Sequence, residues 1–138
     1  MQLIYKIMKV FINKPSKSLQ YLAITKRWVT DLDSHRINVG YLERLHDDFV
    51  KSTAPRYSAE LAEIKRDLFM ISEQAGKTET LLFMHINLLE LMINDSIPED
   101  TVSLNAKHNR LDYWMRDLAV VVYKTKKHLL GLIEVVVF

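Results

Sequence analysis

Glycine and proline are scarce in this chain, which contains only three of each among its 138 residues. All-β folds need these residues at their many turns, whereas long helices need few of them. A chain of this length also corresponds to one domain with one hydrophobic core. We therefore expect an all-α fold, a single-domain bundle of about five or six mostly antiparallel helices over residues 1–138, with one long C-terminal helix.

Apolar residues recur at intervals of three and four along most of the chain, which is the periodicity of amphipathic helices. Interruptions of this pattern set the expected boundaries, and they lie at Pro15, at the segment from Asp33 to Gly40, at Pro55 and at Gly76. The first segment is also compatible with a strand because it contains β-branched residues. The expected helices cover residues 3–11, 16–33, 42–54, 58–75 and 78–93.

The helix expected over residues 78–93 is apolar on nearly all sides. One side carries the leucines and His85, and its flanks add Phe83, Met84 and Leu91. A helix of this kind lies either at the centre of a bundle or in a subunit interface. His85 is expected to be a buried histidine bonded to a neighbouring backbone group or carboxylate, whereas His108 and His128 lie among basic residues and are expected at the surface.

The longest helical pattern follows Pro98, which suits the first turn of a helix because it lacks an N–H group. The apolar period then continues for about ten turns at ~3.6 residues per turn, up to a helix stop expected at Gly131. So long a helix is hard to cover in a chain of this size, which implies a break near residues 106–109 or a dimer partner. The residues expected in that interface are Trp114, Leu118, Val122, Leu129 and Ile133.

Composition excludes several classes of function. The chain has no cysteine, so it forms no disulfide, thiolate metal site or cysteine nucleophile, and a reducing cytoplasm fits. Its net charge of +2 is distributed over mixed signs, which is not the pattern of a dedicated nucleic-acid binder. No apolar run has the ~18 to 20 residues of a membrane span, and no leader pattern occurs. No catalytic motif or phosphate loop is found, so we expect neither catalytic residues nor a cofactor.

One segment nevertheless concentrates metal-ligand types of side chain. Glu43 and His46 are three residues apart and would share one helix face, which is a spacing by which a helix offers a carboxylate and an imidazole to a metal. The His46–Asp47 dyad, with His35 upstream, resembles part of the HD phosphohydrolase pattern. The resemblance covers less than a fifth of the chain and implies an all-α, metal-dependent hydrolase in which these side chains hold a metal that activates water.

A second alternative uses the basic cluster Lys124–His128, in which Lys124, Lys126, Lys127 and His128 provide cations within two turns. These charges fit a weak nucleic-acid contact, and they also complement the negative end of a helix dipole. We favour a third interpretation, a non-catalytic helical interaction or regulatory module that acts in the cytoplasm and associates with itself, as a homodimer, or with a protein partner. Its basis is the surplus apolar surface expected in the C-terminal half.

Overall fold

The computed structural model describes residues 17–52 and 55–137, with the side chain of Val137 excepted. The described elements are three long α-helices and one short 3₁₀ turn: α2 (Lys17–Ser52), η1 (Pro55–Tyr57), α3 (Ser58–Ile93) and α4 (Thr101–Val137). The helix or strand expected over residues 3–11 lies outside the described residues. The fold is therefore an all-α three-helix bundle whose helices contain 36 or 37 residues each.

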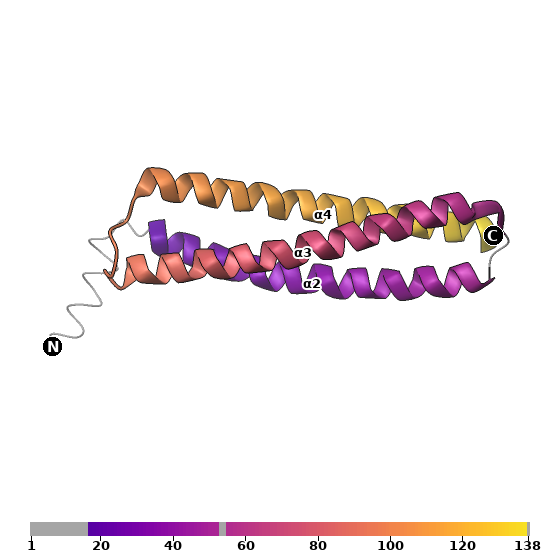
Figure 1. Cartoon of the computed structure of the whole chain (residues 1–138), viewed down its shortest axis with the longest axis horizontal. Coiled ribbons are helices and arrows are strands. Elements are labelled where there is room, and N and C mark those ends of the chain that lie inside the picture. Colours follow the sequence, from indigo (N-terminus) through magenta and orange to yellow (C-terminus); the bar gives the residue numbers. More distant parts are fainter. Residues whose placement is uncertain (1–16, 53–54, 138) are drawn as a thin grey trace.

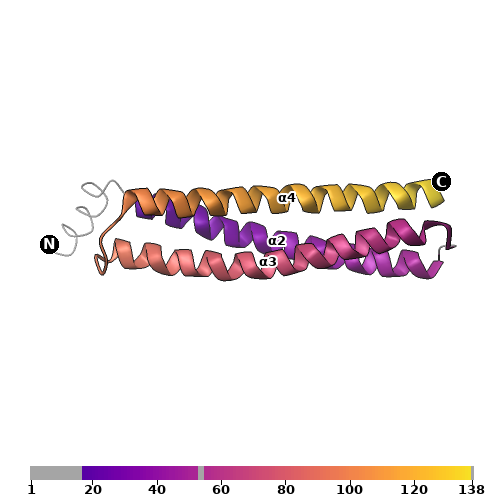
Figure 2. The same cartoon turned by 45° about the horizontal axis from the view of Figure 1, so that its top comes forward.

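The three helices lie side by side along almost their full lengths (Figures 1 and 2). Because α3 runs back along α2, and α4 runs back along α3, the helices α2 and α4 point in the same direction. At 1.5 Å per residue each helix is about 54 Å long. The expectation of five or six helices is wrong, because two pairs of expected helices are each one continuous helix.

A seven-residue repeat explains why these helices are so long. Buried residues in α3 alternate at spacings of three and four without a single interruption: Leu61, Ile64, Leu68, Ile71, Ala75, Thr78, Leu82, His85, Leu89 and Met92. The buried residues of α4 follow the same rule: Leu104, His108, Leu111, Met115, Leu118, Val122, Thr125, Leu129 and Leu132. A strict repeat of this kind holds one helix face against its neighbours as in a coiled coil.

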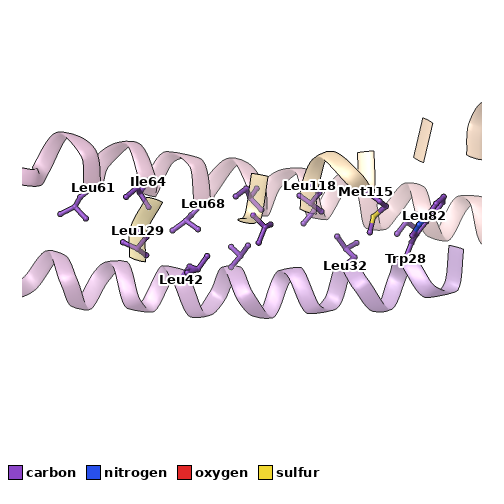
Figure 3. Packing of buried hydrophobic residues seen from close by; sticks show 14 of the residues in the cluster. Trp28, Leu32, Leu42, Leu61, Ile64, Leu68, Leu82, Met115, Leu118 and Leu129 are labelled. Atoms are coloured by element: carbon purple, nitrogen blue, oxygen red, sulfur yellow. The ribbon is translucent and has the colours of Figure 1, made fainter. Parts of the chain in front are cut away.

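In α2 the same repeat runs through the segment that was expected to be a loop. Leu32 and Leu42 are buried on either side of this segment, and Val39 is buried within it. His35 occupies the remaining core position between Leu32 and Val39 and is half-buried. Figure 3 shows leucines of all three helices meeting in the interior. Each buried leucine contributes ~1.5 to 3 kcal/mol, so a glycine penalty of about 1 kcal/mol does not break the helix at Gly40.

Gly76 also lies inside a continuous helix, α3, and not at an interruption. The helix continues because the core positions on both sides of it, Ala75 and Thr78, are buried in the repeat. Where α2 packs against α3, Nη1 of Arg36 in α2 donates a hydrogen bond of 2.6 Å to Oε2 of Glu79 in α3. A Cβ at position 76 would lie 3.5 Å from Nη2 of the same arginine, so this guanidinium extends over the glycine.

The expected break in α4 near residues 106–109 is absent, and the helix continues through Gly131 to Val137. A helix of this length needs no break because α2 and α3 are equally long and cover one side of it. The helix begins at Thr101 and not at Pro98, and Oδ1 of Asp100 accepts a hydrogen bond from the Ser103 N–H at 3.2 Å. This contact is typical of an N-cap.

The connection between α3 and α4 fixes one end of the bundle. Asp95 has a positive φ of 61°, and the Ser96 N–H donates to the Leu91 carbonyl at 2.9 Å, which ends α3 in a left-handed turn. In the same connection, Oε1 of Glu99 accepts a hydrogen bond of 2.8 Å from the Ser18 N–H at the start of α2. All three helices are thereby joined at this end.

None of the helices among the described residues contains a stretch apolar enough to cross a bilayer.

Candidate functional site

Two histidines from different helices meet inside the bundle near the end that carries the α3–α4 connection. His85 of α3 and His108 of α4 are 4% and 5% exposed, and both occupy core positions of the seven-residue repeat. Nε2 of His85 lies 3.2 Å from Nδ1 of His108, which is hydrogen-bonding distance. The repeat therefore places a polar pair at core positions that it otherwise fills mainly with apolar side chains.

Aromatic rings from α2 enclose His108. The Tyr21 ring stacks on it at a centroid distance of 3.6 Å, and the Trp28 ring stacks at 4.6 Å. Tyr21 and Trp28 are two helical turns apart on α2, so they hold the imidazole between them. The Tyr21 hydroxyl also donates a hydrogen bond of 2.5 Å to Oδ1 of Asn105, one turn before His108.

Burial and neighbouring charges keep both histidines neutral at pH 7. Burial lowers the pKa of His108 to about 4, with help from His85 and Lys17, while Asp112 acts in the opposite direction. Burial is also the main reason that the pKa of His85 is lowered, and the nearby Lys107 ammonium adds to the shift. A neutral imidazole has one N–H donor and one acceptor nitrogen, so each ring can donate only once.

One nitrogen of this pair has no partner. Nδ1 of His85 is buried and makes no hydrogen bond within the described part of the chain. If His85 donates to His108 through Nε2, this Nδ1 is an acceptor without a donor. If His108 donates instead, Nδ1 of His85 carries a hydrogen without an acceptor. Either state is unfavourable in an apolar interior, because a buried unsatisfied polar group costs about 1–3 kcal/mol.

An open pocket of about 320 Å³ lies between α3 and α4 beside this unsatisfied histidine. Two exposed cations of α4, Lys107 and Arg110, lie at its edge. The remaining lining residues are His85 and five apolar or aromatic side chains: Leu81, Met84, Leu88, Leu111 and Trp114. The arrangement is suited to holding a molecule that has both an apolar body and a negative charge.

The structure distributes the proposed metal ligands along α2. His35 and His46 are eleven residues apart in one helix, a rise of about 16 Å, which is too far for one ion. Nε2 of His46 donates to the Leu61 carbonyl at 2.7 Å, and its Nδ1 lies 3.5 Å from Oδ1 of Asp47. Glu43 accepts a hydrogen bond from Ser72 at 3.2 Å. Within residues 17–52 and 55–137, no group of three or more His, Asp or Glu residues is arranged to hold a metal ion.

All five residues expected in an interface contact the chain's own core. Leu118, Val122 and Leu129 are buried in the bundle interior, and Trp114 and Ile133 pack half-buried against it. The basic cluster, by contrast, is at the surface. Lys124, Lys126 and Lys127 are exposed on α4, and Nε2 of His128 lies 3.8 Å from Oε2 of Glu60 on α3.

The expected burial of His85 is confirmed, but the expected surface position of His108 is wrong. The basic neighbours Lys107 and Arg110 suggested exposure, whereas the core positions Leu104 and Leu111 place His108 inside. The seven-residue repeat was the signal that could have identified it. The contact between His85 and His108 also depends on how α3 and α4 are aligned along their axes. This alignment cannot be read from the sequence of either helix.

A second surface of interest is the outer face of α3. Phe69, Met70, Phe83 and Met84 are 49–63% exposed, although the core side of the same helix is fully packed. The two Phe–Met pairs are separated by fourteen residues, which is two repeats, so they lie along one face.

Comparisons of the chain with protein-family models, curated proteins and solved structures found no match. The function is therefore inferred from the geometry and chemistry of the described residues.

Proposed function

We propose that this protein is a non-catalytic helical interaction module that associates with itself through the outer face of α3. The observation that carries the proposal is the exposure of two Phe–Met pairs, Phe69–Met70 and Phe83–Met84, on a helix whose opposite side already forms the core. Large apolar side chains gathered on one exposed face are typical of protein interfaces. The proposed compartment is the cytoplasm, with which a chain free of cysteine is compatible.

The spacing of these pairs suits a twofold interface. Phe69 precedes Gly76 by seven residues, and Met84 follows Lys77 by seven. A twofold axis that passes between Gly76 and Lys77 therefore places Phe69 of one copy against Met84 of a second copy, with the two α3 helices antiparallel. Met70 and Phe83 meet in the same way. Such contacts between sulfur and aromatic rings are favourable, and an isologous interface requires a self-complementary surface of this kind.

Charges on the same face favour the antiparallel orientation. Glu73 and Lys77 are exposed and lie one turn apart. The two Lys77 residues lie next to the twofold axis, and each is within about one turn of Glu73 of the second copy, which offsets the repulsion between the two ammonium groups. Arg66 and Glu90 approach each other across the axis in the same manner. A parallel pairing would instead place each charge beside its own counterpart, and like charges that face each other are destabilising.

Sedimentation velocity on the full chain tests this proposal. We expect the wild type to sediment as a dimer and Phe69→Glu as a folded monomer, because a buried unpaired carboxylate is strongly unfavourable. Tyr123→Glu on α4 is the matched control, since Tyr123 is 64% exposed and Phe69 is 63% exposed. A monomeric wild type, or equal effects of the two substitutions, would contradict self-association through α3.

The two alternative functions stay predictions with different tests. Metal-dependent hydrolysis predicts a stoichiometric divalent ion that is lost in His46→Ala. Nucleic-acid binding through the Lys124–His128 cluster predicts an affinity that falls steeply as salt is raised. On α4, Lys124, Lys127 and His128 lie on one side of the helix and Lys126 lies on another, so three of the four side chains are available for one such contact.

A further inference from the structure

We propose that the pocket between α3 and α4 binds a small carboxylate with an apolar body, such as a medium-chain fatty acid or an arylalkanoic acid. The proposal does not depend on self-association. Its basis is the combination of apolar walls, two cations at the edge and a buried imidazole that lacks a hydrogen-bond partner.

The apolar walls and the volume of the pocket determine the kind and size of apolar group that the ligand can carry. Leu81, Leu88 and Leu111 form an apolar surface, and the half-buried ring of Trp114 extends it. The volume of about 320 Å³ is near the lower limit of known ligand pockets, roughly 300 Å³. A linear chain or a single aromatic ring fits such a space.

The edge of the pocket sets the charge of the ligand. Lys107 and Arg110 are three residues apart on α4 and therefore project to the same side. Both are exposed, and neither forms an ion pair with another residue of the described part of the chain. No Asp or Glu is among the described residues that line the pocket. A carboxylate can accept hydrogen bonds from both cations, and charge-assisted bonds are the stronger kind.

His85 is the independent observation that points to a ligand. Its ring lines the pocket, it is 4% exposed, and its Nδ1 has no partner in the described residues. When His108 donates its Nδ1–H to Nε2 of His85, Nε2 is the acceptor nitrogen, so the single N–H proton of the neutral His85 ring is on Nδ1. A carboxylate oxygen beside that atom would satisfy it. The ligand would thereby remove an unfavourable feature of the unliganded protein.

Isothermal titration calorimetry with decanoate tests the proposal on the full chain. Decanamide is the uncharged control of equal length, and acetate is the charged control without an apolar body. We expect decanoate to bind about tenfold or more tightly than decanamide, because the charge-assisted bonds are lost in the amide. Acetate should show no saturable binding. Equal affinity for decanoate and decanamide, or the absence of decanoate binding, would overturn the proposal.

Two double variants locate the binding site. Lys107→Gln with Arg110→Gln removes both cations at the pocket edge, and we expect decanoate affinity to fall about tenfold or more. Lys124→Gln with Lys127→Gln removes the same charge from exposed positions of the same helix outside the pocket and should leave the affinity unchanged. All four residues are exposed, so the fold is expected to persist. Equal losses in the two variants would assign the binding to net charge and would overturn the proposed site.

Discussion

Nε2 of His85 and Nδ1 of His108 are 3.2 Å apart, and this contact joins α3 to α4 inside a core that is otherwise largely apolar. Both rings are held neutral by their surroundings. In the unfolded chain each imidazole is free to bind a proton near its ordinary pKa of about 6.5. The pair therefore makes the stability of the fold depend on pH.

The free energy of unfolding should fall as the pH is lowered from about 6.5 to about 4. In this range the unfolded chain binds protons that the folded chain does not, because the pKa of His108 is lowered to about 4 and that of His85 is also lowered. Above this range both states are neutral at these sites, and the effect is absent. For His108 alone the loss at pH 4 is on the order of 3 kcal/mol. Urea unfolding at a series of pH values measures it.

The double variant His85→Leu with His108→Leu is the control for this effect. It retains the carboxylates, which also titrate in acid, and it removes only the buried imidazoles. We expect its stability to decline much less between pH 6.5 and pH 5 than that of the wild type. The same slope in both proteins would show that the two histidines are not the cause.

Replacing Gly131 by alanine should raise the free energy of unfolding by about 1 kcal/mol. The residue lies inside α4, where glycine is about 1 kcal/mol less favourable than alanine. A Cβ at this position would meet no atom within 4 Å. Thermal unfolding of Gly131→Ala at neutral pH checks the result. Destabilisation would indicate that α4 ends at Gly131, as the local sequence suggests.

His46 should be a structural residue whose loss destabilises the fold. It is 3% exposed, and its Nε2 donates to the Leu61 carbonyl at 2.7 Å. His46→Phe removes this hydrogen bond, while the Leu61 carbonyl keeps its acceptor role within α3, so we expect a loss of about 0.5–1.5 kcal/mol. The measurement is thermal unfolding of both proteins with and without a chelator. A chelator that destabilises the wild type and not the variant would contradict a purely structural role and support the metal hypothesis.

The sequence was sufficient for the helical class of the fold but not for the number of helices. Gly76 and the segment ending at Gly40 are local signals for a helix end, whereas the seven-residue repeat continues through both. A repeat of apolar residues acts over the whole helix, so the burial of many side chains outweighs one unfavourable residue. Three helices of nearly equal length, 36 or 37 residues each, also explain how a small chain covers one side of α4 without a partner.

The candidate site was less accessible to prediction. His85 was expected in the core, but its partner His108 was assigned to the surface from its charged neighbours, and their contact depends on how α3 and α4 are aligned. The apolar excess over residues 78–93 was visible in the sequence. The core positions of the structure are needed to tell which of these side chains face outward. Phe83 and Met84 are two that do.

Disulfide trapping tests the antiparallel association of α3 most directly, because the chain has no cysteine of its own to interfere. In the proposed dimer the two Lys77 residues lie next to the twofold axis, whereas the two Leu91 residues are roughly 40 Å apart at 1.5 Å per residue. We predict that Lys77→Cys forms a covalent dimer under mild oxidation and that Leu91→Cys, which is also exposed to solvent, does not. Efficient cross-linking of both variants, or of neither, would contradict the account.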